Sequence, residues 1–181
     1  MARSQPTTLL AGAILSTVLL SALPVATLQA DDDHHGDQRN FRIRLTSFQE
    51  VPAISSGAKG QFHAGISKDE TAISYELSYS GLEGEVRQAH IHLGQKTANG
   101  GISVFLCQTT FNPDPTGLAP TCPQQGNVTG TLTEKNVIGP VSQGILAGQF
   151  AELVRAIQAG QTYANVHSVT FPGGEIRGQI K

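Results

Sequence analysis

Residues 41–46 read Phe-Arg-Ile-Arg-Leu-Thr, and this strict alternation of apolar and polar side chains decides the fold class. Successive side chains of a β-strand point to opposite faces of a sheet, so a period of two predicts a strand with one buried face. The same alternation returns at 62–66 and 73–79. Further strands are expected at 86–93, 101–107, 128–133, 162–169 and 174–180.

Short glycine-rich or polar segments separate these stretches, as at 55–57 and 172–174. One segment departs from the alternation, because the apolar residues of 149–159 recur at helical spacing and Gly160 follows them. Many short alternating strands with such turns are typical of a β-sandwich or barrel. We therefore predict a mostly β fold, an antiparallel sandwich or barrel of about seven to nine strands with one short amphipathic helix.

The N-terminal segment has the pattern of an export signal. Arg3 supplies a positive charge, residues 9–23 are apolar or small, and Ala30 is the small residue expected before a cleavage point. The apolar stretch is shorter than the ~20 residues that a membrane-spanning helix needs, although a retained anchor stays open as the alternative. We predict a signal peptide over 1–30, hence a secreted or periplasmic protein without a stable membrane span after cleavage.

The remainder is expected to be a flexible acidic, histidine-containing lead-in over 31–40 and one domain over 41–181. Residues 31–40 contain no apolar side chain, and their His34-His35 pair is typical of a solvated tail. The chain has 12 basic and 14 acidic residues; without Arg3 of the leader, 11 basic residues remain. The small net charge provides no electrostatic attraction for nucleic acid or anionic lipid. Tryptophan, on which nucleic-acid bases could stack, is absent.

Cys107 and Cys122 are the only cysteines. An even number in an oxidising compartment favours a disulfide, which would contribute about 3 kcal/mol by restricting the unfolded chain. A soft metal site is the alternative, but the pair lacks the C-x-x-C spacing of structural zinc sites. Asn127 begins a glycosylation sequence that matters only in a eukaryotic host.

The most informative stretch is 86–93, Val-Arg-Gln-Ala-His-Ile-His-Leu. Alternation puts Ile91 on the apolar face and both His90 and His92 on the polar face, with backbones about 7 Å apart. In the strand over 162–169, His167 likewise lies on the polar face. If the two strands share a sheet, three imidazoles meet.

Three imidazoles are a typical ligand set for copper or zinc and leave one coordination position open. Asn165 lies on the polar face of the His167 strand, and Glu175 and Arg177 lie on that of the next strand, so these side chains are candidates to orient a ligand. Two alternatives stay open: structural histidines hydrogen-bonded to carbonyls or carboxylates, and acid–base catalysis at the same cluster. No nucleophile-elbow, phosphate-loop or dinucleotide motif occurs.

Several motifs follow one another along the domain. They are Gln-Glu-Val-Pro at 49–52, His-Ile-His-Leu-Gly at 90–94, Asn-Gly at 99–100, Gly-Gln-Thr-Tyr-Ala-Asn-Val-His-Ser at 160–168 and Pro-Gly-Gly-Glu-Ile-Arg-Gly-Gln at 172–179. Together they make the chain similar to the CHRD domain, a module of chordin that also occurs in stand-alone exported bacterial proteins. Chordin antagonises bone morphogenetic proteins, so the resemblance implies binding rather than catalysis. Chordin's cysteine-rich repeats are missing, and growth-factor binding is therefore not carried over.

The His90–His92 strand also looks like the copper-binding strand of copper–zinc superoxide dismutase. That family's zinc-ligand histidines with an aspartate are missing, so the likeness implies at most a mononuclear site and no dismutase activity. We expect a non-enzymatic exported binding or structural module, with an extracytoplasmic protein or a small ligand as its partner. The alternatives are a mononuclear copper or zinc protein and an enzyme that uses the same cluster.

Overall fold

Eight antiparallel strands form one sheet that curls into a nearly closed barrel, as the alternation predicts. The computed structural model describes Met1 and residues 39–181. The predicted leader and most of the predicted lead-in, including His34 and His35, lie outside the described residues.

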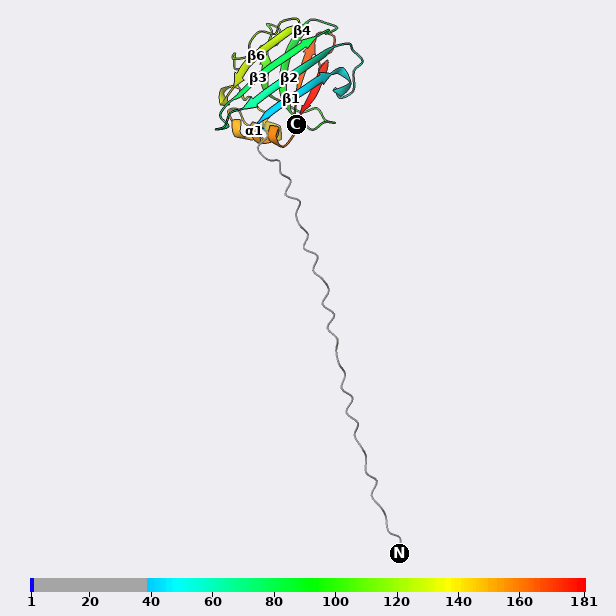
Figure 1. Ribbon diagram of the computed structural model, residues 1–181, viewed down its shortest axis with the longest axis vertical. Coiled ribbons are helices and arrows are strands. Elements are labelled where there is room, and N and C mark those ends of the chain that lie inside the picture. Colours follow the sequence, from blue (N-terminus) through cyan, green and yellow to red (C-terminus); the bar gives the residue numbers. More distant parts are fainter. Residues whose placement is uncertain (2–38) are drawn as a thin grey trace. The chain divides into compact units, whose positions relative to one another are not determined.

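The strands begin and end close to the predicted positions. They are β1 (Asn40–Thr46), β2 (Lys59–Ile66), β3 (Ile73–Ser80), β4 (Val86–Leu93), β5 (Ile102–Cys107), β6 (Gly126–Leu132), β7 (Thr162–Ser168) and β8 (Ile176–Ile180). Their order in the sheet is β5-β4-β7-β8-β1-β2-β3-β6, and the two edge strands, β5 and β6, approach each other. Figure 1 shows β1, β2 and β3 side by side on one wall of the barrel.

Strands β1, β2 and β3 bury one row of apolar side chains inside the barrel. Phe62 of β2 is paired with Ile43 of β1 and with Leu77 of β3, and all three belong to the core. The alternating polar residues, such as Arg42 and Arg44, are exposed on the outer face. The half-buried strands that the sequence predicts are thus present on this wall.

Strands β4, β7 and β8 form the other wall and place the histidines. The turn after His167 makes β7 and β8 an antiparallel hairpin, as predicted, although β8 begins only at Ile176. On its other side β7 pairs with β4, so that His90 lies opposite Asn165. Ile91 and Val166 are fully buried in the barrel core, which confirms the predicted faces of both strands.

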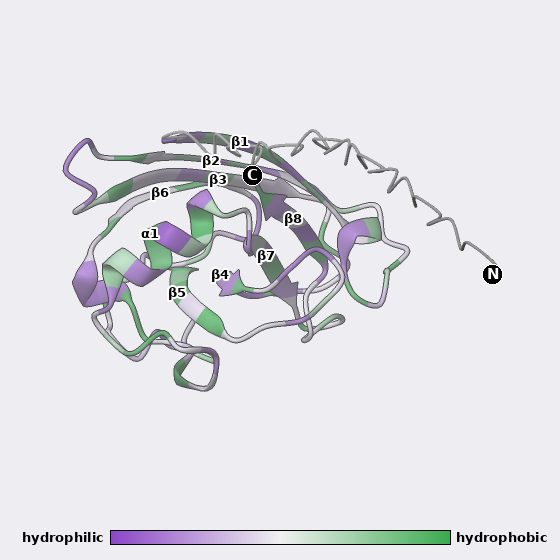
Figure 2. Ribbon diagram, turned by 90° about the horizontal axis from the view of Figure 1, so that it is seen from below, coloured by the Kyte–Doolittle hydropathy of each residue, from purple (hydrophilic) through white to green (hydrophobic). Residues whose placement is uncertain are grey.

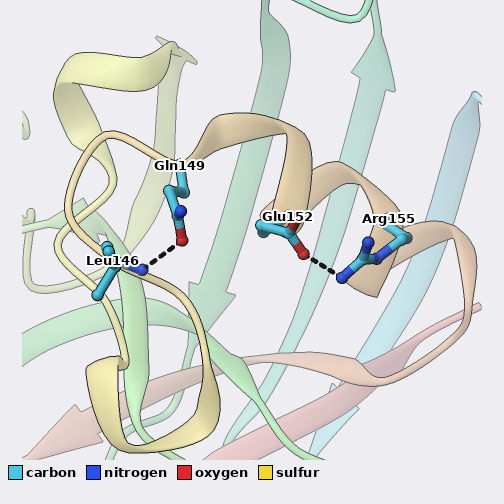
Figure 3. Close-up of polar contacts among 4 residues, drawn as sticks. All are labelled: Leu146, Gln149, Glu152 and Arg155. Carbon is cyan, nitrogen blue, oxygen red and sulfur yellow. Dashed lines mark hydrogen bonds and ion pairs between the residues drawn. The ribbon is translucent and has the colours of Figure 1, made fainter.

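The single α-helix within residues 39–181, α1 (Phe150–Gln158), closes one end of the barrel (Figure 2). Its buried side consists of Phe150, Leu153, Val154 and Ile157, as the helical spacing predicts. Gly160 ends the segment in a left-handed conformation with φ of 67°. The Gln149 side chain accepts a hydrogen bond from the Leu146 amide at 2.8 Å, and Arg155 is paired with Glu152. Figure 3 shows both contacts.

Three 3₁₀ turns lie in the connections, at Ser47–Gln49, Glu134–Asn136 and Val141–Gln143. In the part of the chain that the structure describes, every helix is too short or too polar to cross a membrane.

The predicted disulfide joins Cys107, at the end of β5, to Cys122 in the connection to β6, with the Cα atoms 5.0 Å apart. Such a bond is typical of proteins that fold outside the cytoplasm, and it therefore points to an extracytoplasmic location.

Candidate metal centre

His90, His92 and His167 come together on the face of β4 and β7 that points away from the barrel core. One ring nitrogen from each residue lies within 4.8 Å of the others. We call this group the histidine centre. The sequence predicts the clustering because both strands alternate, and the direct pairing of β4 with β7 brings the two polar faces together.

The face that carries the histidine centre is buried, unlike the polar face of β1 to β3. His90 has no exposed surface, and His92 and His167 are 7 % and 6 % exposed. Backbone groups of the connections after β4 and β7 contact the rings, and the connection after β1 supplies Glu50 nearby. Three loops thus cover the sheet where alternation alone predicts a polar surface.

Two of the rings are held by backbone carbonyls. Nδ1 of His92 lies 2.9 Å from the Gly100 oxygen, and Nδ1 of His167 lies 2.9 Å from the Pro172 oxygen. A carbonyl only accepts hydrogen bonds, so each Nδ1 carries the proton and donates it. In a neutral ring the other nitrogen, Nε2, then has a free lone pair, which is the state of a metal-ligating histidine.

His90 lies between the other two rings and an aromatic side chain. Its Nδ1 atom is 3.2 Å from Nε2 of His167, and its ring packs edge-on against Phe105 with centroids 4.3 Å apart. Among the described residues, Nε2 of His90 and Nε2 of His92 are buried without a hydrogen-bond partner. Buried polar atoms in this state call for an explanation such as a bound ion or water.

Nε2 of His167 is in contact with a second acceptor. It lies 3.0 Å from Oδ1 of Asn165 as well as 3.2 Å from Nδ1 of His90. His90 can donate its Nδ1 proton to the His167 lone pair, whereas the Asn165 oxygen carries no proton to donate. If His90 instead carries its proton on Nε2, the electron pairs of His90 Nδ1, His167 Nε2 and the Asn165 oxygen converge beside His167, and a cation at this point would satisfy all three.

Burial keeps the three rings neutral. It lowers the pKa of His90 strongly, and the neighbouring His167 and His92 lower it further. It lowers the pKa of His92 to about 4, although the hydrogen bond to Gly100 opposes the shift. The pKa of His167 is also lowered by burial, against the hydrogen bond to Pro172. Neutral imidazole is the form that binds metal ions, so protons compete little at neutral pH.

Tyr163 and Arg177 form a stack beside His92. The rings of His92 and Tyr163 are parallel with centroids 4.8 Å apart, and the Arg177 guanidinium lies 3.4 Å from the centre of the Tyr163 ring. Arg177 also donates to the carbonyl oxygens of Gln95 and Ala98, both at 2.9 Å. The buried arginine therefore fixes the loop that supplies the Gly100 carbonyl to His92.

The residues expected to support the histidines divide into two groups. Asn165 contacts His167 directly, and Arg177 reaches the centre through Tyr163. Glu175 is fully buried, but its Oε1 atom accepts a hydrogen bond from the Glu83 amide at 2.9 Å, and the partner of His167 Nδ1 is the Pro172 carbonyl. The Pro-Gly-Gly turn thus supplies a backbone oxygen where the sequence pattern pointed to a carboxylate.

Glu50 is the carboxyl group nearest to this arrangement in the hydrogen-bond network. It accepts hydrogen bonds from the Asn165 side chain and the Val51 amide. Burial raises the pKa of Glu50 to about 7, although the charge of Arg177 and the two hydrogen bonds oppose the shift. His167, Asn165 and Glu50 thus form a continuous polar chain.

Comparison with protein-family models shows that one described as the CHRD domain matches residues 41–180. No curated protein and no solved structure matches the chain.

Proposed function

The chain belongs to the CHRD family, and we propose that this member binds one copper or zinc ion through His90, His92 and His167. The observation that carries the proposal is the convergence of unprotonated nitrogen atoms inside a buried site. The two backbone carbonyls fix the proton of His92 and of His167 on Nδ1, and the unprotonated Nε2 of His167 lies 3.2 Å from Nδ1 of His90.

The donor set fits these ions. Three neutral imidazoles are borderline ligands that suit zinc and copper better than calcium or magnesium, which prefer oxygen. The Gly100 and Pro172 carbonyls act as the outer partners that metal-ligating histidines usually have. When bound, zinc would supply Lewis acidity and copper would add redox chemistry.

The alternative of purely structural histidines explains less of the geometry. Structural rings are expected to satisfy both nitrogens, whereas two rings of the histidine centre, His90 and His92, bury an Nε2 atom that has no partner in the described part of the chain. Nε2 of His63, outside the centre, is also buried without a partner. The proposal therefore takes up the alternative of a mononuclear copper or zinc protein in place of the binding or structural module expected first. We further propose that the protein is exported to the periplasm or secreted, which the disulfide supports and the mass of the mature chain would test.

Titration with zinc and with copper tests the proposal. The mature chain with His34→Ala and His35→Ala is used, so that the N-terminal histidines do not bind the ion. One ion should bind per chain, and the melting temperature should rise, since an ion at one hundred times its Kd stabilises the native state by about 2.7 kcal/mol.

His90→Ala should abolish this rise, whereas His63→Ala should leave it unchanged. His63 lies on β2 outside the histidine centre and is a matched control for the loss of one imidazole. Failure of either ion to bind stoichiometrically would reject the proposal and favour hydrogen-bonded structural histidines. An equal loss of the rise in His63→Ala would place the binding elsewhere.

A further inference from the structure

The Asn165 side chain lies at the histidine centre itself and not only behind it. Asn165 is 2 % exposed, belongs to the same face of β7 as His167, and is paired with His90 of β4. Its Oδ1 atom is 3.0 Å from Nε2 of His167, and its side chain also lies near the His92 ring, whose pKa it raises against the effect of burial. Asn165 is thus next to all three histidines.

Glu50 fixes the direction in which the amide oxygen points. The Nδ2 atom of Asn165 donates to the Glu50 carboxyl group. Gly174 packs against both partners, because a Cβ atom at this position would lie 2.6 Å from Oε1 of Glu50 and 2.7 Å from Nδ2 of Asn165. A reversed amide would turn its oxygen toward the carboxylate, which is also an acceptor. The oxygen therefore faces the histidines.

The contact between Oδ1 of Asn165 and Nε2 of His167 has no proton to share. The Pro172 carbonyl holds the proton of the neutral His167 ring on Nδ1, and an amide oxygen carries none. A proton donated by His90 would satisfy the nitrogen but leave the oxygen unpaired. Two buried electron pairs 3.0 Å apart repel each other, and a cation that binds both removes the repulsion.

The separations agree with a tetrahedral metal site. Zinc lies about 2.0–2.1 Å from imidazole nitrogen and about 2.0–2.2 Å from oxygen, so two ligand atoms at tetrahedral angles are about 3.3–3.5 Å apart. Nε2 of His167 is 3.0 Å from Oδ1 of Asn165 and 3.2 Å from Nδ1 of His90, so these atoms need to move by only a few tenths of an ångström. Nε2 of His92 completes the set within the 4.8 Å that the three histidine nitrogens span.

We propose that Oδ1 of Asn165 is the fourth ligand of a divalent zinc or copper ion, alongside the three rings of the histidine centre. The proposal rests on the metal binding proposed above and adds a consequence for function. Four protein ligands make a closed site, which holds an ion for structure or storage, whereas a catalytic site keeps one position open for water or substrate. Imidazole and oxygen ligands also favour the divalent ions over Cu(I), which soft sulfur ligands select.

A crystal structure of the zinc-loaded protein tests this directly. The mature chain with His34→Ala and His35→Ala is crystallised with one equivalent of zinc, and anomalous scattering locates the ion. Oδ1 of Asn165 should lie about 2.0–2.2 Å from it, in the place that a water molecule takes in an open site. Zinc bound by the three histidines with water as the fourth ligand would overturn this inference and leave the proposed function intact. No zinc at the histidines would reject both.

Cobalt provides the same test in solution, because azide binds to Co²⁺ that has an open position and changes its visible absorption. Azide should leave the spectrum of the cobalt-loaded parent unchanged and should change that of Asn165→Ala, in which one position is free. Asn136→Ala is the matched control, since Asn136 is also buried but its Oδ1 atom accepts a hydrogen bond from the Thr133 amide, outside the histidine centre. Its cobalt spectrum should not respond to azide.

An azide-induced change in the parent would show an open position and overturn the proposal. An Asn165→Ala spectrum identical to that of the parent, with and without azide, would do the same, because the loss of a ligand has to alter the absorption of the ion. If Asn165→Ala does not fold, the zinc-loaded structure and the azide response of the parent still decide.

Discussion

The buried imidazoles and the buried Glu50 carboxyl respond to pH in opposite directions. The pKa values of His90, His92 and His167 are lower in the native state than in the unfolded chain, and that of Glu50 is raised to about 7. Below the usual histidine pKa of about 6.5, the histidines of the unfolded chain bind protons, whereas the buried rings of the native state stay neutral. Between the usual carboxyl pKa and about 7, native Glu50 instead keeps a proton that the unfolded chain releases.

Metal-free protein should therefore lose stability as the pH falls from about 7 to about 5. Three histidines favour the unfolded state in this window and one carboxyl favours the native state, so the net proton uptake on unfolding grows from near zero at pH 7 to about two at pH 5. The free energy of unfolding should fall by roughly 3–4 kcal/mol between pH 7 and pH 5, most steeply near pH 5, as measured by urea unfolding with EDTA present.

Glu50→Gln is the internal control for this pH response. It removes the one contribution that grows as the pH falls, so the variant should lose stability more steeply than the parent between about pH 7 and pH 5. A free energy of unfolding that stays constant over this range would mean that the three rings are already protonated in the native state or are open to solvent.

At the level of single residues, the sequence predicts the histidines better than their partners. Alternation assigns His90, His92 and His167 to the polar faces of two strands without knowledge of the tertiary structure. The Gly100 and Pro172 carbonyls belong to loops, and no side-chain pattern reports where a backbone oxygen points. The Gln-Glu-Val-Pro motif singles out Glu50, but its position beside Asn165 depends on how the loop after β1 folds back.

At the level of elements, β4 and β7 are buried on both faces although their sequences alternate. Every residue of β7 is buried, and the core side of β4 includes Ala89 and Ile91. The alternation correctly separates the face toward the barrel from the other face. It does not reveal that loops cover the second face, because that cover comes from segments without periodicity.

Replacing Ile91 or Val166 by aspartate should destabilise the protein severely. Each substitution would put an unpaired carboxylate into the barrel core, at a cost of about 3 kcal/mol or more. Thr131→Asp is the matched control, since Thr131 lies in strand β6 and is exposed. Equilibrium unfolding in urea measures all three. Core variants as stable as Thr131→Asp would show that the assigned strand faces are wrong.

At the level of the whole molecule, the sequence predicts strands but not their order. Only local hairpins such as β1–β2–β3 and β7–β8 follow from the chain order, whereas β4 pairs with β7, β1 with β8 and β3 with β6 across long connections. The histidine centre depends on one of these distant pairings, β4 with β7. Its existence could therefore be predicted only conditionally, on the assumption that the two histidine strands are neighbours.

The disulfide also concerns the whole molecule, because it lies close to where the two edge strands of the sheet, β5 and β6, approach each other. Cys107 ends the edge strand β5, and Cys122 belongs to the connection that leads to the other edge strand, β6. Replacing both cysteines by alanine should lower the free energy of unfolding by about 3 kcal/mol, since the unfolded chain regains the freedom of a loop with a sequence separation of 15.

Guanidinium unfolding of the double variant measures this loss, and the parent protein unfolded in excess dithiothreitol is the control. Both samples lack the crosslink, so they should lose similar stability if loop entropy is the main cause. A much larger loss in the alanine variant would instead assign the effect to packing, because Cys107 and Cys122 are buried in the core and alanine fills less space. A double variant as stable as the oxidised parent would show that the hydrogen bonds of Gln108 to the Ala119 and Pro120 carbonyls suffice to hold the loop.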